Sequence, residues 1–381
     1  MQQIFGASDE LLRKQRGLGR MRTYSVIPLC PEGGLIEWCE NTEAIGMYLM
    51  YNQNSGGVPS AHQRYRPEEP RDISRLHALF PAKKDPRTGK VLQYLPSPPV
   101  LGEERRRKFL EEFLKFQPVF RYYFLERYVD PVTWNERRQN YTRSTAIASI
   151  VGHICGLGDR HFNNILIEET TGEVIHIDLG IAFDGGTTLP IPERVPFRLT
   201  RDTIDPMGVM GVQGLFRDTC ESALRILRDS EKILVPIASV LLHDPLANWQ
   251  ATVSKIDNEM VNTVNLEEDA GSSSPCAKRA RPSSNQRKNE KLYQTLRGSP
   301  KGSPETLFSS DSEGVDGCED GQRAKPTNLL AESAISRLKD KLNGRLKGEL
   351  LSVEKHVALL IQEAVSVDNL GLIYVGWGPQ Y

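Results

Sequence analysis

The sequence has little that would mark a metal-binding, disulfide-rich or membrane-spanning protein. None of its six cysteines forms a Cys-x-x-Cys pair, so the cysteines indicate neither a zinc site nor a disulfide framework. No apolar run approaches the roughly 18 residues that a transmembrane helix needs. The N-terminus also lacks the charged and apolar pattern of a signal peptide. We therefore expect an intracellular protein in a reducing compartment.

The sequence also lacks an excess of charge of either sign. Its 381 residues include 48 Lys and Arg against 49 Asp and Glu, which gives a formal net charge of -1. Direct binding to nucleic acid or to an anionic membrane would require a basic excess. We therefore expect no direct nucleic-acid site and no membrane contact. A hydrophobic content of 39% is sufficient for a substantial core.

Chemically versatile residues are concentrated at positions 156–183, in the stretch GLGDRHFNNILIEETTGEVIHIDLGIAF. Its β-branched runs at 164–168 and 174–178 flank a turn with a glycine, which predicts a two-stranded hairpin. A hairpin brings its two ends together, so we expect Asn164 beside Asp178. The turn that contains Asp159 and His161 leads into the same end. Oxygen-bearing side chains gathered in this way suit Mg²⁺ and phosphate groups.

Each of these four residues taken alone is an ordinary turn or cap former, and that interpretation stays open. Their combined spacing is more specific. An acid, a histidine, an asparagine five residues after the acid and a later Asp-x-Gly are typical of a phosphotransferase catalytic loop. We therefore interpret the hairpin as a catalytic and metal site.

Hydrophobic spacing predicts a fold that is mainly α with small β elements. The opening residues are expected to form a helix that buries Ile4, Leu11 and Leu12 and stops at Gly17. Residues 21–39 are expected to form two strands around a Pro-Glu-Gly-Gly turn. Further helices are expected at 102–128 with a break at Pro118, at 141–158, as a pair within 211–249, and as two after 327.

Composition shifts sharply at two places along the chain. Residues 51–102 are rich in Pro, Gly and charge, which predicts an irregular insertion. Between Leu266 and Pro326 only 13 of 61 residues are apolar, too few to offset the entropy of ordering. We therefore expect a disordered linker at 263–326. Its basic cluster KRARPSSNQRKNEK is either a nuclear import signal or a solvated linker face.

Several of these segments together resemble the phosphatidylinositol-3-kinase-related protein kinases. The resemblance is carried by GLGDRHFNNIL, HIDLG, VPFRLTRD at 195–202, LLHDPLANW at 241–249 and the ordered C-terminal segment, which this family calls FATC. It implies a protein/lipid-kinase-like large lobe with a remnant of the small lobe and a C-terminal helical module. The implied divisions are 1–50 for the small-lobe remnant and hinge, 51–102 for the insertion, 103–262 for the large lobe with its catalytic and activation loops, 263–326 for the linker, 327–348 for a helix and 349–381 for the FATC-like segment.

The resemblance also implies roles for the residues of the hairpin. Asp159 and His161 would act on the acceptor hydroxyl, and which of the two is the base stays open. Asn164 and Asp178 would hold the Mg²⁺ or Mn²⁺ ions that bridge the phosphates of ATP. The stretch 178–196 would be the activation loop.

The hinge of the family corresponds here to Glu37, Trp38 and Cys39. The backbone of this segment would meet adenine, and Trp38 would pack against it. The tail departs from the family pattern, because Gly376-Trp377 is followed by Gly-Pro-Gln-Tyr where relatives tend to carry a second tryptophan.

The resemblance implies a nuclear serine/threonine protein kinase of the DNA-damage-response type, with protein substrates and regulatory protein partners. A phosphoinositide kinase is the less favoured enzyme, because the stretch 178–196 has one basic residue, Arg194, where a phosphorylated head group calls for several. The chain begins at a helix, without the family's phosphate-covering loop and small-lobe lysine. We therefore expect weak ATP binding by this polypeptide alone, and a non-catalytic interaction module is the alternative.

Overall fold

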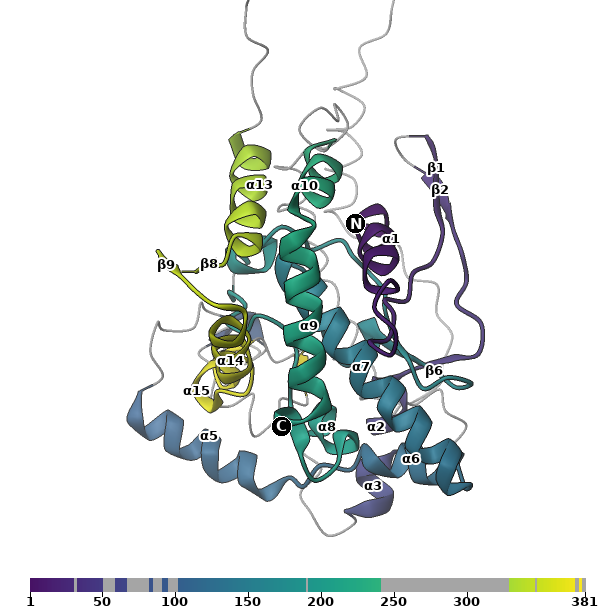
Figure 1. Cartoon of the computed structure of the whole chain (residues 1–381). Coiled ribbons are helices and arrows are strands. Elements are labelled where there is room, and N and C mark those ends of the chain that lie inside the picture. Colours follow the sequence, from purple (N-terminus) through teal and green to yellow (C-terminus); the bar gives the residue numbers. More distant parts are fainter. Residues whose placement is uncertain are drawn as a thin grey trace, which may run out of the picture. The chain divides into compact units, whose positions relative to one another are not determined.

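The computed structural model describes residues 1–30, 33–50, 59–66, 82–84, 91–94, 102–189, 191–240, 329–346, 348–373 and 377–378. These residues belong to one compact unit, formed by 1–261 together with 327–381. The expected linker at 263–326 and the LLHDPLANW segment lie outside the described residues. The expected fold class is confirmed, because helices dominate and the strands are short (Figure 1).

Two long helices, α7 (Pro131–Cys155) and α9 (Leu215–Asp229), pack against each other at the centre of this unit (Figure 1). The Asp130 side chain caps the start of α7 by accepting a 2.8 Å hydrogen bond from the Thr133 amide. The helix ends at Gly156, whose φ of 59° closes the last turn in the left-handed conformation. All but one of the residues from Tyr141 to Cys155 are buried, as the small and apolar sequence predicted.

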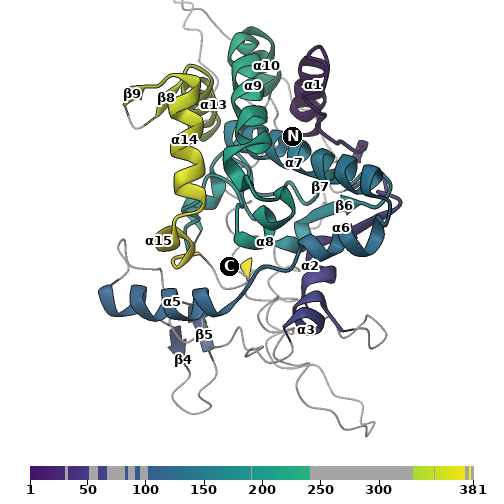
Figure 2. The same cartoon turned by 60° about the horizontal axis from the view of Figure 1, so that its bottom comes forward.

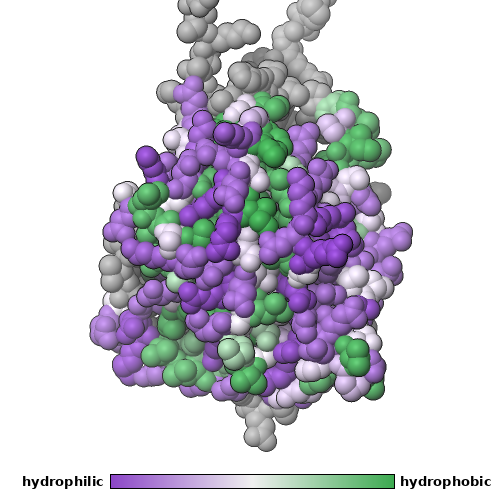
Figure 3. All heavy atoms as spheres, in the orientation of Figure 1, coloured by the Kyte–Doolittle hydropathy of each residue, from purple (hydrophilic) through white to green (hydrophobic). Residues whose placement is uncertain are grey.

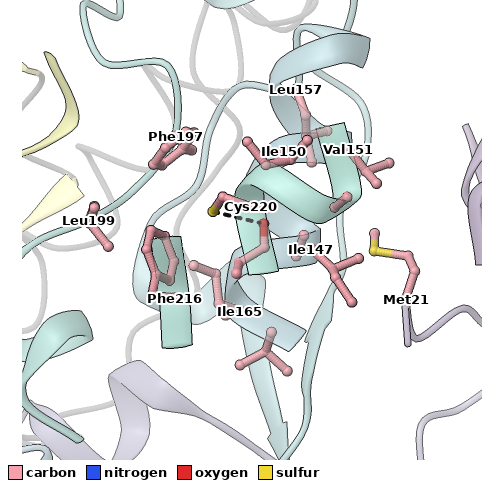
Figure 4. Close-up of a cluster of buried hydrophobic side chains, with 14 of the residues drawn as sticks. Met21, Ile147, Ile150, Val151, Leu157, Ile165, Phe197, Leu199, Phe216 and Cys220 are labelled. Atoms are coloured by element: carbon pink, nitrogen blue, oxygen red, sulfur yellow. Dashed lines mark hydrogen bonds between the residues drawn. The ribbon is translucent and has the colours of Figure 1, made fainter. Parts of the chain in front are cut away.

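A cluster of buried side chains joins these two helices to the loops that follow α7 (Figure 4). Ile147 and Ile150 of α7 lie in the same cluster as Phe216 and Cys220 of α9, and the Cys220 thiol lies 3.7 Å from the Ala146 carbonyl. Burying an aliphatic or aromatic side chain of this size stabilises the fold by about 1.5 to 3 kcal/mol. The loops contribute Leu157, Phe197 and Leu199 to this cluster, and the hairpin contributes Ile165, so the core that holds the helices also holds the loops.

A three-stranded antiparallel sheet lies beside α7, in the order β3 (Thr42–Ala44), β6 (Ile165–Glu168) and β7 (Val174–His176). The β6–β7 pair is the hairpin that the sequence predicted, with Ile165 opposite His176. A separate hairpin consists of β1 (Val26–Cys30) and β2 (Gly33–Ile36), as expected for residues 21–39. Every residue of β1 and β2 is exposed.

The N-terminal helix α1 (Gln2–Leu12) buries Ile4, Leu11 and Leu12 as predicted. It ends at Leu12, five residues before the Gly17 stop that the sequence suggested. The chain after the helix is held against it by the Asp9 carboxylate, which pairs with Arg13 at 2.6 Å and accepts a 2.8 Å hydrogen bond from the Met21 amide.

Short elements connect the first hairpin to the centre of the unit. They are α2 (Ile45–Leu49), α3 (Ala61–Tyr65), the hairpin of β4 (Ala82–Lys84) and β5 (Val91–Tyr94), α5 (Glu103–Lys115) and α6 (Arg121–Arg127). The break between α5 and α6 contains Pro118, as predicted. Within 51–102, where the sequence predicted an irregular insertion, the described residues form the short helix α3 and the β4–β5 hairpin.

Further short elements precede or follow the β6–β7 hairpin, which is called the catalytic hairpin from here on for its predicted role. They are the 3-10 turns η1 (Phe162–Asn164), η2 (Gly185–Thr188), η3 (Asp205–Met207) and η4 (Gly211–Gln213), with α8 (Arg201–Ile204) and α10 (Glu231–Ser239). In the part of the chain that the structure describes, no helix combines the length and the apolar character needed to cross a membrane.

The C-terminal module contains α13 (Leu329–Leu342), the strands β8 (Arg345–Leu346) and β9 (Glu349–Leu350), α14 (Val353–Ala364) and α15 (Val367–Leu370). Both predicted helices after 327 are therefore present. Figures 1 and 2 show α14 beside α9, against which it packs. A second apolar cluster joins α5 to the tail, through Phe109, Phe113, Phe116, Leu370, Leu372, Ile373 and Trp377. The tail is thus docked on the same unit.

Candidate active site

A cavity of about 1080 Å³ lies between the β1–β2 hairpin and the catalytic hairpin. Glu37, Trp38 and Cys39 line one side of it, and Asp178 and Leu179 line the other. The three residues expected to form the hinge and one residue expected to bind metal therefore face the same space. Its volume is large enough to accept a small-molecule ligand of nucleotide size.

The predicted hinge segment directly follows β2, and only some of its backbone groups form hydrogen bonds. The Glu37 amide donates to the Ser25 carbonyl at 2.9 Å, and the Glu37 carboxylate accepts from the Ser25 amide at 2.7 Å. Among the hydrogen bonds of the described residues, none uses the Glu37 carbonyl or the Cys39 amide. A carbonyl and an amide two residues apart on an extended segment match the donor and acceptor edge of adenine. The Trp38 side chain is 85% exposed beside them.

The predicted catalytic residues meet in the loop after α7. Asp159 has a left-handed backbone with φ of 55°. The Asn164 side-chain amide donates to the Asp159 carbonyl at 3.0 Å and to its carboxylate at 3.4 Å. His161 Nε2 lies 3.8 Å from Asp159 Oδ2. These three residues are not among those that line the cavity, whereas Asp178 is, so the cavity reaches the loop at Asp178.

The two ends of the catalytic hairpin are closed as predicted. The Ile177 amide donates to the Asn164 carbonyl at 3.1 Å, which fixes the backbone of Asn164 next to that of Asp178. The donor set of one carboxylate and one amide oxygen suits Mg²⁺ or Mn²⁺, which complete their coordination with waters and substrate phosphates. Within the described ranges, no three His, Cys, Asp or Glu side chains form a group that could hold a metal by themselves. The residues therefore fit an ion that binds together with a nucleotide.

Arg160 is a structural residue of this site that the sequence did not single out. Its side chain is among the largest that are fully buried, with 2% of the residue exposed. Its guanidinium donates to the Gly158 and Ile177 carbonyls, both at 2.7 Å, and also to the Asp178 carbonyl. Burial lowers the pKa of Arg160. Arg160 thus joins the loop that contains Asp159 to the backbone at Ile177 and Asp178.

The imidazole of His161 lies in an environment that favours its neutral form. Burial lowers the pKa of His161, and the cations of Arg198 and Arg160 act in the same direction, while the Asp159 carboxylate opposes them. A histidine of this kind is uncharged near neutral pH. It can therefore accept a proton or donate a hydrogen bond.

Two residues of the stretch 191–198 support the catalytic loop from the other side. The Glu193 carboxylate accepts a 2.6 Å hydrogen bond from the Asp159 amide, and burial raises the pKa of Glu193 to about 7. The Arg198 guanidinium lies 3.5 Å from the centre of the Phe162 ring and donates to the Trp377 carbonyl at 2.8 Å. Sequence reasoning missed both roles, although VPFRLTRD contains Arg198.

Helix α13 fixes the beginning of the predicted activation loop. Asp184 has a left-handed backbone with φ of 63°. Its carboxylate pairs with Arg337 at 3.0 Å and with Lys341 at 2.6 Å. Arg337 also donates to the Phe183 carbonyl at 3.0 Å. Residues more than 150 positions apart in the sequence therefore meet at this loop.

Comparison with known proteins gives matches over most of the chain. The family model described as phosphatidylinositol 3- and 4-kinase matches residues 1–251, and the FATC domain model matches residues 350–381. The serine-protein kinase ATM of Sus scrofa is 36% identical over 99% of this chain and 11% of its own length. The serine/threonine-protein kinase tel1 of Schizosaccharomyces pombe is 37% identical over 99% of this chain and 11% of its own length.

Solved structures give the same result. The FAT and kinase domain of CtTel1 matches with a TM-score of 0.66 and 33% identity, over all of this chain and 20% of that chain. The complete CtTel1 dimer with C2 symmetry matches with a TM-score of 0.67 and 32% identity, over all of this chain and 11% of that chain. This chain spans about a tenth of the length of the curated relatives that it matches.

Proposed function

Because this chain belongs to the phosphatidylinositol 3- and 4-kinase family, we propose that it carries the catalytic centre of a serine/threonine protein kinase of the ATM and Tel1 type. The reaction is transfer of the γ-phosphoryl group of ATP to a serine or threonine hydroxyl of a protein. The proposal applies to this chain the activity for which its relatives are named.

One observation carries the proposal. The segment with adenine-matching backbone atoms and the predicted metal ligand Asp178 line one cavity. Asp178 comes two residues after β7, which pairs with β6, and the Ile177 amide between them bonds to the Asn164 carbonyl. A nucleotide with its base at Glu37–Cys39 would extend its phosphates toward Asp178. Asp159 and His161 would then lie beyond Asp178, where the acceptor hydroxyl would bind.

The chemistry of each side chain supports this order. The acceptor oxygen forms a bond to the γ-phosphorus while the bond from that phosphorus to the β,γ-bridging oxygen breaks, and ADP leaves. The hydroxyl proton passes to the Asp159 and His161 pair, within which a neutral His161 can accept a proton or donate a hydrogen bond. Mg²⁺ or Mn²⁺ held by Asn164 and Asp178 would neutralise phosphate charge. Arg160 holds the loop that contains Asp159 in register with the backbone at Asp178 by binding carbonyls of both.

A phosphoinositide is the less favoured acceptor. Arg194 is the one basic residue of the stretch 178–196, and a multiply phosphorylated head group needs several such charges. The named relatives are serine or serine/threonine protein kinases. We therefore extend the proposal to protein substrates, regulatory protein partners and a nuclear location in the DNA-damage response.

The proposal is tested by calorimetry of ATP and Mg²⁺ binding, together with phosphate transfer from γ-labelled ATP. The proteins compared are the wild-type chain, Asp178→Asn and the matched control Asp218→Asn, whose carboxyl is exposed on α9. We expect weak binding by the wild-type chain and by Asp218→Asn, and none by Asp178→Asn. Equal binding by all three would contradict the site.

The acceptor is tested by offering a serine-containing protein and phosphatidylinositol vesicles side by side. Label on the protein alone supports a protein kinase. Label on the lipid alone contradicts it. A wild-type chain that binds ATP but labels neither acceptor would support the alternative of a non-catalytic interaction module.

A further inference from the structure

A buried carboxylate lies where three distant parts of the chain meet. Glu193 accepts a 2.6 Å hydrogen bond from the Asp159 amide in the catalytic loop, and the nearby Trp377 side chain in the tail acts to lower its pKa as a hydrogen-bond donor, against the rise that burial causes. Its own amide donates to the Gly186 carbonyl at 3.0 Å. Catalytic loop, activation loop and tail therefore come together at one residue.

The packing around Glu193 leaves no room for side chains on two neighbouring residues. A Cβ atom added to Gly158 would lie 2.6 Å from Glu193 Oε2, and one added to Gly186 would lie 2.2 Å from the same oxygen. Neither glycine has the left-handed backbone that would explain it by conformation. Space for the Glu193 carboxyl therefore accounts for glycine at 186. At 158 it does so together with Ile181, whose Cγ2 would lie 2.8 Å from the added Cβ.

Burying a carboxylate is costly unless it is hydrogen-bonded, and an apolar side chain would fill such a space at lower cost. Because burial raises the pKa of Glu193 to about 7, the ionised form predominates above neutral pH. In that form the group offers two acceptor oxygens and no donor, so it can satisfy two N–H groups that approach from different segments. A glutamine in this place would offer one acceptor and one donor. The chemical character of Glu193 thus matches its two partners.

The tail residue that contacts Glu193 is itself firmly held. Trp377 is buried in the cluster with Phe109, Phe113 and Phe116 of α5, and its carbonyl accepts from Arg198 at 2.8 Å. The Arg198 guanidinium also lies 3.4 Å from the Arg160 carbonyl in the catalytic loop. The docked tail therefore reaches the catalytic loop by two polar routes.

We infer that Glu193 is a positioning residue that holds the left-handed backbone of Asp159 and makes its placement depend on the docking of Trp377. This inference rests on the proposed function, because it concerns the geometry of the phosphate-transfer step. Glu193 lies outside the residues that line the cavity. Its loss should therefore slow transfer without weakening nucleotide binding.

The test compares Glu193→Ala, Glu193→Gln and Trp377→Phe with the wild-type chain. Trp377→Phe keeps the aromatic ring and removes the N–H donor. The matched controls are Glu221→Gln, whose carboxyl pairs with Arg217 on α9 at 2.8 Å, and Trp134→Phe, whose ring is stacked against Arg138. The measurements are kcat, KM for ATP and hydrogen exchange of the Asp159 amide.

We expect Glu193→Ala to lower kcat by about 10- to 100-fold with KM for ATP unchanged, since displacement of a reacting group by a fraction of an ångström to 1 Å has effects of this size. The Asp159 amide should exchange at least about tenfold faster, because opening of its hydrogen bond sets the rate. Glu193→Gln and Trp377→Phe should give smaller changes in the same direction. Both controls should match the wild type.

The outcomes separate this inference from the proposed function. If the wild-type chain transfers no phosphate, the proposed function is wrong, and the exchange rate of the Asp159 amide still decides the positioning role. If the wild-type chain is active and the three variants leave kcat and exchange unchanged, the inference is overturned. If Glu193→Ala does not fold, Glu193→Gln and Trp377→Phe carry the test.

Discussion

The two sides of the cavity are built in opposite ways. On the side of the catalytic hairpin, Arg160 is buried and bonded to backbone carbonyls before and after the hairpin, and Asp159, Asp178 and Asp184 all hold left-handed backbones. Such conformations cost non-glycine residues about 1 to 3 kcal/mol each unless the surroundings enforce them. On the hinge side, β1 and β2 pair with each other and expose every residue.

Figure 3 shows the exposed β1–β2 hairpin as an apolar patch at the upper right, where Figure 1 places these strands. The patch includes Val26, Ile27, Leu29, Leu35 and Ile36. The difference between the two sides corresponds to what each would bind. Phosphate transfer requires atoms fixed in place, whereas a flat base needs little more than one edge of backbone and an apolar surface.

The side of the cavity formed by the catalytic hairpin, here called the fixed side, should lose the most stability when Arg160 is replaced. Arg160→Leu leaves the Gly158, Ile177 and Asp178 carbonyls without their donor. We expect a loss of about 4 kcal/mol in the free energy of unfolding, because each buried unsatisfied carbonyl costs about 1 to 3 kcal/mol. Urea denaturation followed by circular dichroism measures this. Arg107→Leu, which removes an exposed i,i+4 pair on α5, is the control and should change little. A stable Arg160→Leu protein would contradict the account.

Helix α14 of the C-terminal module should make the stability of the protein depend on pH. His356 is fully buried and accepts from Arg228 at 2.7 Å, and burial followed by the charges of Arg228 and Lys341 lowers its pKa to about 4. The unfolded chain takes up a proton near pH 6.5 that the folded chain refuses until about pH 4. Stability therefore falls as the pH falls through this window.

We expect His356→Gln to remove up to about 3 kcal/mol of this loss, since each pH unit corresponds to about 1.4 kcal/mol. Denaturant melts at pH 7.5 and pH 4.5 measure the difference between the two proteins. Equal losses in wild type and variant over this range would show that His356 takes up its proton equally in both states.

Gly156 and Gly17 both have left-handed backbones, but only Gly156 is closely packed. Substituting each one therefore distinguishes the cost of backbone strain from the cost of steric crowding. Gly156 has φ of 59° and Gly17 has φ of 78°, but an added Cβ would lie 2.2 Å from the Asp184 amide nitrogen at Gly156 and meets nothing within 4 Å at Gly17. Alanine at Gly17 should cost about 1 kcal/mol from the left-handed backbone alone. Alanine at Gly156 should cost about 2 kcal/mol more, because the backbone of Asp184 must move. Thermal melts of both variants decide this, and equal costs would refute the packing.

The hinge side should show the smallest effect on stability. Trp38→Ala removes a side chain that is 85% exposed, so the melting temperature should hardly change. The KM for ATP should rise about tenfold, because the base could no longer pack on the indole. A tenfold rise corresponds to a loss of roughly 1.4 kcal/mol of binding free energy. Val132→Ala, at a similarly exposed position on α7, should change neither. An unchanged KM in Trp38→Ala would remove this residue from the proposed base site.

The fold could be predicted from the sequence where local patterns determine it. Periodicity and turn chemistry predicted a helix at 141–158 and a hairpin of strands at 164–168 and 174–178, and the structure has the helix at Pro131–Cys155 and the strands at Ile165–Glu168 and Val174–His176. The first ten residues of the helix were not predicted. The path of the chain after α1 was not predicted either, because it depends on the Asp9 carboxylate and the Met21 amide meeting across the turn. No local pattern specifies such a contact.

The candidate site shows the same division. Asp159, His161, Asn164 and Asp178 are close in sequence, and their spacing was enough to predict that they meet. Glu193 meets the Asp159 amide 34 residues away, and Asp184 meets Arg337 and Lys341 more than 150 residues away. No spacing rule connects these partners. The contacts that hold the catalytic and activation loops could therefore be identified only from the three-dimensional structure.

The pairing of Asp184 with Arg337 across 153 residues has a consequence for how the protein is made. Synthesis at roughly 5 to 20 residues per second separates the emergence of these two partners by about 8 to 30 seconds. The helices α7 and α9 can pack within that interval, since their sequences lie close together. The activation loop must wait for α13. Assembly on the ribosome thus has a built-in order, in which a compact but chemically incomplete lobe precedes the finished active site.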